Sequence, residues 1–120
     1  RCVRLLGEQD DDTLLRYYRE SNLFLSPSVF ETFGMAIQEA LMFGMPALVH
    51  AGGNSANHIR EGLNGHVVHS HREMARLLSR LIDAPGELAQ LHQNMRTVPS
   101  NYLDSWQAAA DLLCRFVETI

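Results

Sequence analysis

The segment Glu31-Thr-Phe-Gly-Met-Ala-Ile-Gln-Glu39 decides the fold that we expect for this chain. An apolar run at 23–26 precedes it, and a glycine followed by a second apolar run at 46–50 comes after it. This order indicates a strand, a loop, a helix and another strand. One carboxylate then lies on a loop at the carboxyl end of a strand, and the other lies inside the helix. In open α/β sheets, nucleotides and their sugars bind at that edge.

Outward from this segment, the sequence predicts strands that alternate with helices. The predicted strands are 2–6, 23–26, 46–50 and 66–68, and the predicted helices are about 12–20, 34–43, 55–61, 74–82, 88–95 and 106–120. Strands that alternate with helices usually pair in parallel through right-handed crossovers. We therefore expect an α/β fold, a Rossmann-like open parallel sheet of about four strands with flanking helices, in a single domain over residues 1–120.

Composition limits the classes of protein to which the chain can belong. Its 120 residues, 46% of them hydrophobic, support one modest domain. The net charge of −4 and the scattered arrangement of ten basic residues, all Arg, argue against a nucleic-acid partner. No apolar run approaches the ~20 residues of a membrane span. Cys2 and Cys114 have no metal or redox spacing, which favours a reduced, cytoplasmic protein. Because the start lacks Met and a signal-peptide pattern, we expect a fragment of a longer protein.

The two acids flank a helix start that is suited to binding a diphosphate. Backbone N–H groups are free at the start of the 34–43 helix, the helix dipole is positive there, and Gly34 permits close approach. Glu39 lies about 7–8 Å further along the axis, where its carboxylate can accept hydrogen bonds from a ribose diol. Glu31 would lie on the other side of the phosphates, beside the hexose. One segment could thus bind both sugars of a nucleotide-diphosphate sugar.

Simpler interpretations of the same residues remain open. Glu39 can be an ordinary acid on a helix surface, and Glu31 a helix-start residue that interacts with the dipole. Five apolar or aromatic residues are expected to be core or helix-packing groups rather than ligand contacts: Tyr17, Tyr18, Met35, Met42 and Met45. His69 and His71 lack a further ligand at metal spacing, so we expect no metal site.

Together these motifs resemble the retaining glycosyltransferases of family 4, also called group 1, which have the two-domain GT-B fold. The shared positions run through nearly the whole chain: Gly7, Leu14, Tyr18, Pro27-Ser28, Glu31, Phe33-Gly34, Glu39-Ala40, Gly44, Pro46, Gly52-Gly53, Asn64-Gly65 and Ser105-Trp106. The resemblance implies the donor-binding part of the C-terminal domain of such an enzyme.

The resemblance also implies a role for each residue of the central segment. Glu31, as the catalytic candidate, would contact hydroxyls of the donor sugar and position it for transfer with retention of configuration. Backbone amides of Phe33, Gly34 and Met35 would bind the sugar and the diphosphate, and Glu39 would hold the ribose. No metal or other cofactor is expected, because positive side chains and helix dipoles stabilise the leaving diphosphate in this family.

Gly52 and Gly53 would shape the wall of the donor cleft, but the sequence after them departs from the family pattern. The family often has an acid there, whereas this chain has Asn54-Ser-Ala-Asn-His58, and the spacing to Asn64-Gly65 is one residue longer. His50 and His58 flank this loop and could line the cleft. The phosphate-binding Arg and Lys of the family, and its acceptor-binding N-terminal domain, lie outside the chain. We therefore expect the fragment alone to be inactive.

In the full protein, the expected reaction is transfer of a hexose from a nucleotide-diphosphate sugar to a hydroxyl acceptor. One alternative is a non-catalytic module that only binds a nucleotide sugar. Another is an interaction domain in which Glu31 and Glu39 are merely surface residues. The sequence does not identify the base, the sugar or the acceptor, and it leaves membrane contact of the full protein open.

Overall fold

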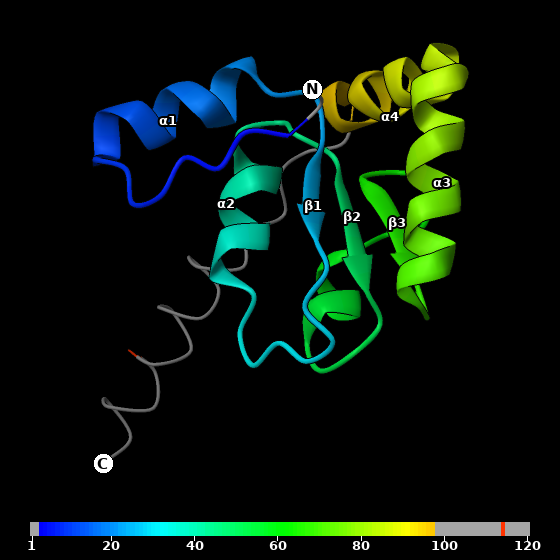
Figure 1. The fold of residues 1–120 in the computed structure, drawn as a ribbon, viewed down its shortest axis with the longest axis horizontal. Helices are drawn as coiled ribbons and strands as arrows, with labels where there is room; N and C mark the ends of the chain where they lie inside the picture. The colour runs from blue at the N-terminus through cyan, green and yellow to red at the C-terminus, as the bar shows by residue number, and fades with distance from the viewer. Residues whose placement is uncertain (1–2, 98–113, 115–120) are drawn as a thin grey trace.

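The computed structural model describes residues 3–97 and Cys114, and within them it contains a parallel sheet of three strands in the order β1-β2-β3 (Figure 1). The elements are α1 (Asp11–Glu20), β1 (Phe24–Ser26), α2 (Met35–Met42), β2 (Ala47–His50), the 3-10 helix η1 (Ser55–His58), β3 (Gly65–Val68), α3 (His71–Asp83) and α4 (Pro85–Thr97). In the strand register, Ala47 of β2 lies between Phe24 of β1 and Gly65 of β3. The predicted α/β class and parallel pairing are therefore confirmed.

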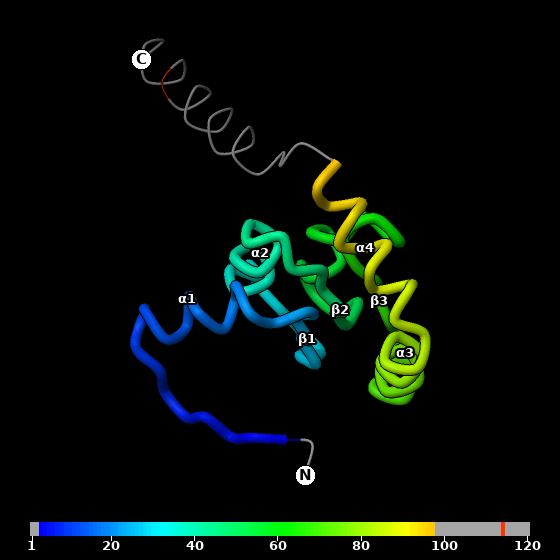
Figure 2. Tube along the Cα trace, turned by 90° about the horizontal axis from the view of Figure 1, so that it is seen from above, coloured from blue at the N-terminus to red at the C-terminus, as the bar shows by residue number. Residues whose placement is uncertain are grey.

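Helices cover both faces of this sheet, as Figure 2 shows with α2 on one side and α3 on the other. On the α2 side, Ile37 and Leu41 pack with Val49 of the central strand. On the α3 side, Met74 packs with Leu48 and Val68. Because the apolar side chains of β2 point alternately to the two faces, both faces of this strand are buried, and Leu48 and Val49 are completely inaccessible.

Local sequence signals explain where several helices begin and end. The Asp10 carboxylate accepts a hydrogen bond from the Thr13 amide at 2.7 Å and caps α1. At α3, the Ser70 hydroxyl accepts from the Glu73 amide, and the Glu73 carboxylate reaches back to the His69 amide. Gly44 follows α2 with a φ of 75°, the left-handed conformation that often terminates a helix.

The structure corrects the prediction of a strand at 2–6. Residues 3–6 form no strand, and their apolar side chains are exposed, with 77% of Val3 and 94% of Leu5 accessible. A strand is stabilised by a neighbouring strand, and this segment pairs with neither edge of the described sheet. The predicted helix at 55–61 is instead the shorter 3-10 helix η1.

The C-terminal helices were predicted in part. The predicted helix at 88–95 extends over Pro85–Thr97, because Pro85 is tolerated in the first turn of a helix. The helix predicted at 106–120 falls outside the described residues apart from Cys114, which is helical and exposed. None of the helices in residues 3–97 combines the length and apolar character that crossing a bilayer requires.

Candidate functional site

Two loops at the carboxyl ends of β1 and β2 are joined through their backbones. Glu31 and Gly53 form an isolated parallel bridge, and the Asn54 amide donates to the Glu31 carbonyl at 2.6 Å. A Cβ atom on Gly52 would lie 1.4 Å from the Val29 carbonyl oxygen, so only glycine fits there. Gly52 and Gly53 therefore allow the two loops to approach each other closely, whether or not they also border a ligand.

The Glu31 side chain turns toward the start of α2. Its Oε1 accepts hydrogen bonds from the backbone amides of Thr32, at 3.1 Å, and Gly34, at 3.3 Å. A carboxylate is favourable there because the amino end of a helix carries partial positive charge. This is the helix-start interaction that the sequence left open as an alternative. The same interaction places Glu31, the predicted catalytic acid, directly beside the predicted diphosphate site.

A histidine and an asparagine fix the backbone immediately before α2. His58 Nε2 lies 2.7 Å from the Phe33 carbonyl oxygen, and Asn54 Nδ2 donates to the same oxygen at 3.3 Å. Gly34 has a φ of 70°, and a Cβ on it would lie 2.9 Å from the His58 ring. The side chains of Phe33 and Met35 are exposed. The start of α2 therefore presents an ordered, positively polarised backbone at the surface.

Glu39 lies in the second turn of α2, and its side chain is held by a residue from α1. Glu39 Oε2 accepts a hydrogen bond from the Tyr18 hydroxyl at 3.0 Å. The Tyr18 ring is buried and stacks on Phe43, with ring centroids 5.4 Å apart. Burial of the phenol, together with its hydrogen bond to Glu39, raises the pKa of Tyr18 to about 12. Tyr18 thus packs in the core, as predicted, and also positions an exposed carboxylate. Met45 is buried as well, whereas Met35 and Met42, for which the same was predicted, are exposed.

The predicted residues lie on the two loops and along α2, and we call this set of residues the strip. Glu31 is at the start of this helix and Glu39 is further along it, on the side that faces α1. Two other histidines lie at the same edge of the sheet. His50 Nδ1 accepts from the Gly52 amide at 3.2 Å, and the His50 and His71 rings are 5.7 Å apart. His50 therefore supports the glycine loop.

The interactions made by Tyr18, Asn54 and His58 could not be predicted from the sequence. Each joins residues more than 20 positions apart, so sequence spacing gives no direct signal of contact. For Tyr18, the one available signal was its place in the pattern of the resembling family. For His58, it was the departure from that pattern after Gly53.

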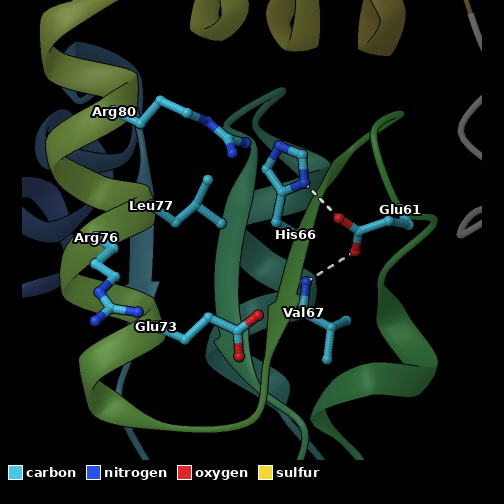
Figure 3. A pocket seen from close by; sticks show the side chains of 7 residues that line it. All are labelled: Glu61, His66, Val67, Glu73, Arg76, Leu77 and Arg80. Atoms are coloured by element: carbon cyan, nitrogen blue, oxygen red, sulfur yellow. Dashed lines mark hydrogen bonds and ion pairs between the residues drawn. The ribbon is translucent and has the colours of Figure 1, made fainter.

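A separate pocket lies on the α3 side of β3, away from this strip (Figure 3). Several of its charged side chains have partners within the pocket or beside it. The Glu61 carboxylate interacts with His66 Nδ1 and accepts from the Val67 amide at 2.9 Å. Arg80 makes two hydrogen bonds to Glu87, at 3.0 and 2.7 Å. Among the described residues, no three His, Cys, Asp or Glu side chains are arranged to hold a metal ion.

Comparison with known proteins identifies the family. The sequence profile of the glycosyl transferases group 1 matches residues 2–98. The chain belongs to this family. Two relatives are D-inositol 3-phosphate glycosyltransferases. The protein from Rhodococcus jostii (strain RHA1) is 34% identical over 111 residues, covering 91% of this chain and 24% of the relative. The protein from Salinispora arenicola (strain CNS-205) is 36% identical over 106 residues, covering 87% and 23%.

Two solved structures share the fold of this group 1 chain. Sucrose-phosphate synthase from Thermosynechococcus elongatus matches with a TM-score of 0.75 at 24% identity, covering 95% of this chain and 29% of that chain. HepE from Anabaena, solved in complex with UDP, matches with a TM-score of 0.70 at 22% identity, covering 83% and 29%. The predicted fold, part of the C-terminal domain of a GT-B glycosyltransferase, agrees with these neighbours. The chain spans about a quarter of the length of the curated relatives that it matches.

Proposed function

We propose that this domain binds the nucleotide-diphosphate sugar donor of a hexosyltransferase. In the complete protein, the hexose is transferred to a hydroxyl acceptor with retention of configuration. The observation that carries the proposal is the start of α2, a polarised backbone with one acid on the loop just before the helix and another in its second turn. Its occurrence in a group 1 glycosyl transferase supports a sugar-transfer role for this strip.

The diphosphate is assigned to the amides at the start of α2. The first N–H groups of a helix have no partner within the helix, and they attract anions together with the helix dipole. Phe33, Gly34 and Met35 supply this backbone, in which the Gly34 amide already donates to Glu31, and the hydrogen bonds of Asn54 and His58 to the Phe33 carbonyl hold it in one geometry. A rigid set of donors needs no rearrangement when charge develops on the leaving diphosphate. We expect no metal to be required for this step.

The two acids are assigned to the two sugars of the donor. Glu39, in the second turn of α2, would accept hydrogen bonds from the ribose, and UDP in the related HepE structure supports a nucleotide ligand. Glu31 would accept from hydroxyls of the hexose. While its Oε1 caps α2, its Oε2 can contact the sugar. Gly52 and Gly53 would form the adjoining wall.

Calorimetry on the full-length protein tests donor binding. Uridine and guanosine diphosphates and their sugars are titrated into the wild type and into Glu39→Ala. We expect saturable binding that Glu39→Ala weakens at least about tenfold, since a hydrogen bond to a charged group contributes about 1.5–3 kcal/mol. Glu8→Ala, which changes an exposed glutamate outside the strip, is the matched control and should bind like the wild type. Equal binding by all three proteins contradicts the assignment.

Turnover distinguishes an enzyme from a module that only binds nucleotide sugars. The full-length protein is incubated with the donor that binds and with hydroxyl acceptors, and the anomeric configuration of the product is read by NMR. Transfer with the donor's configuration supports the proposal. An inverted product contradicts retention, and binding without transfer to any acceptor contradicts the enzymatic role.

A further inference from the structure

Tyr18 and Glu39 connect two helices at the proposed ribose position. Tyr18 comes from α1 and Glu39 from α2, and the phenol donates to Glu39 Oε2 at 3.0 Å. The two side chains differ in exposure, since the Tyr18 residue is 8% accessible whereas Glu39 is exposed. A buried donor therefore holds a carboxylate that faces the surface.

The phenol is itself held firmly. Its ring stacks on Phe43 with an interplanar angle of 2°, and it belongs to a core cluster with Ala40 and Met45. An exposed glutamate otherwise samples many rotamers, and ordering it during ligand binding costs conformational entropy. A carboxylate that is already fixed at one oxygen avoids much of this cost. The contact thus pre-organises Glu39 for a ligand.

We propose that Tyr18 is a positioning residue for ribose: it holds Glu39 Oε2 so that Glu39 Oε1 accepts from the ribose diol of the donor nucleotide. This inference rests on the proposed function. It adds a consequence that nucleotide binding alone does not require, namely that Tyr18 contributes to the preference for nucleotides that carry ribose hydroxyls. The phenol keeps its proton near neutral pH, because burial and Glu39 raise its pKa.

Calorimetry on the full-length protein tests this role with UDP, or with GDP if that base is preferred, and with the 2′,3′-dideoxy analogue. The variants are Tyr18→Phe, Glu39→Ala and the double variant. Tyr17→Phe is the matched control, because Tyr17 is the neighbouring phenol on α1 and no hydrogen bond joins it to Glu39 among the described contacts. Thermal melts check that each variant is folded.

We expect Tyr18→Phe to lower the affinity for the ribonucleotide about three- to tenfold, less than Glu39→Ala does, because Tyr18 acts on the ribose only by ordering Glu39. Affinity for the dideoxy analogue should stay nearly constant, so the ratio between the two ligands falls. Tyr18→Phe should add nothing to Glu39→Ala. An unchanged ratio in a folded Tyr18→Phe protein, or equal loss for both ligands, overturns the role of Tyr18 while leaving donor binding intact. Absence of any nucleotide binding by the wild type overturns the proposed function as well.

Discussion

At the start of α2, Gly34 adopts a left-handed backbone conformation and His58 occupies the space next to its Cα atom. The φ of Gly34 is 70°, and a Cβ there would lie 2.9 Å from the His58 ring. This glycine was predicted as a point of close backbone approach to a ligand. The structure adds a second requirement, because a side chain there would push His58 away from the Phe33 carbonyl.

Gly34→Ala should therefore destabilise the protein. The left-handed conformation costs a residue with a Cβ about 1–2 kcal/mol, before any displacement of His58. Gly86→Ala is the matched control, since Gly86 lies in α4 with open space around it, and there alanine should stabilise by about 0.5–1 kcal/mol. Urea denaturation of both variants measures the difference. Equal effects of the two substitutions would contradict the geometry at Gly34.

Tyr18 gives the protein an alkaline limit to stability. Its pKa is raised from 10.0 to about 12 in the folded state, so between these pH values the unfolded state binds fewer protons than the folded state. The free energy of unfolding therefore falls as pH rises from 10 to 12, and the contribution, of the order of 2–3 kcal/mol, is fully present below pH 10. Tyr18→Phe should show a shallower decline over this interval in urea titrations followed by circular dichroism. If the wild type and Tyr18→Phe lose equal stability between pH 10 and 12, the ionisation of Tyr18 is not the cause of the decline.

The sequence predicts which residues belong to the strip, but it does not predict the contacts that hold them. The acids and glycines of the strip could be named because residue type and spacing suggest their chemistry. The bonds from Tyr18 to Glu39 and from His58 to Phe33 could not, because they depend on how α1 and η1 pack beside α2.

At the level of elements, burial determined which predictions were correct. The runs at 23–26 and 46–50 form β1 and β2 because a neighbouring strand and helices on each face cover them. The run at 3–6 has similar strand propensity but remains exposed and unpaired with this sheet. Propensity alone does not decide whether a partner is adjacent. Helix ends were predicted within a few residues wherever a cap or a glycine marked them, as at Asp10 and Gly44.

The contact between the two loops is a property of elements that one substitution can test. Gly52→Ala would place a methyl group within 1.4 Å of the Val29 carbonyl oxygen, so the loops after β1 and β2 must separate. We expect Gly52→Ala to cost about 1–3 kcal/mol more than Gly86→Ala, the typical penalty of overpacking. Gly86, like Gly52, has a φ outside the left-handed region, yet it has open space around it, so it is the matched control. Chemical denaturation compares the two, and equal losses would show that the loops yield freely.

For the whole molecule, the family assignment and the partial length must be considered together. The group 1 profile matches residues 2–98, yet the chain spans about a quarter of its curated relatives. The proposed donor cleft would be bordered by two domains, so the tests of binding and turnover use the full-length protein. Family membership could be predicted from sequence because the shared residues occur in a fixed order and spacing along the chain. The donor and the acceptor could not, because their selectivity depends on contacts that these motifs do not contain.

Glu31→Gln in the full-length protein separates catalysis from helix capping. The glutamine carbonyl oxygen can still accept from the Thr32 and Gly34 amides, so stability should change by less than about 1 kcal/mol. The negative charge beside the donor sugar is lost, and we expect turnover to fall on the order of a hundredfold while donor affinity changes far less. Glu8→Gln, an exposed control, should retain full turnover. Steady-state kinetics with the donor and a hydroxyl acceptor measure the effect. If Glu31→Gln turns over at the wild-type rate, then Glu31 only caps α2, and the catalytic acid lies elsewhere in the protein.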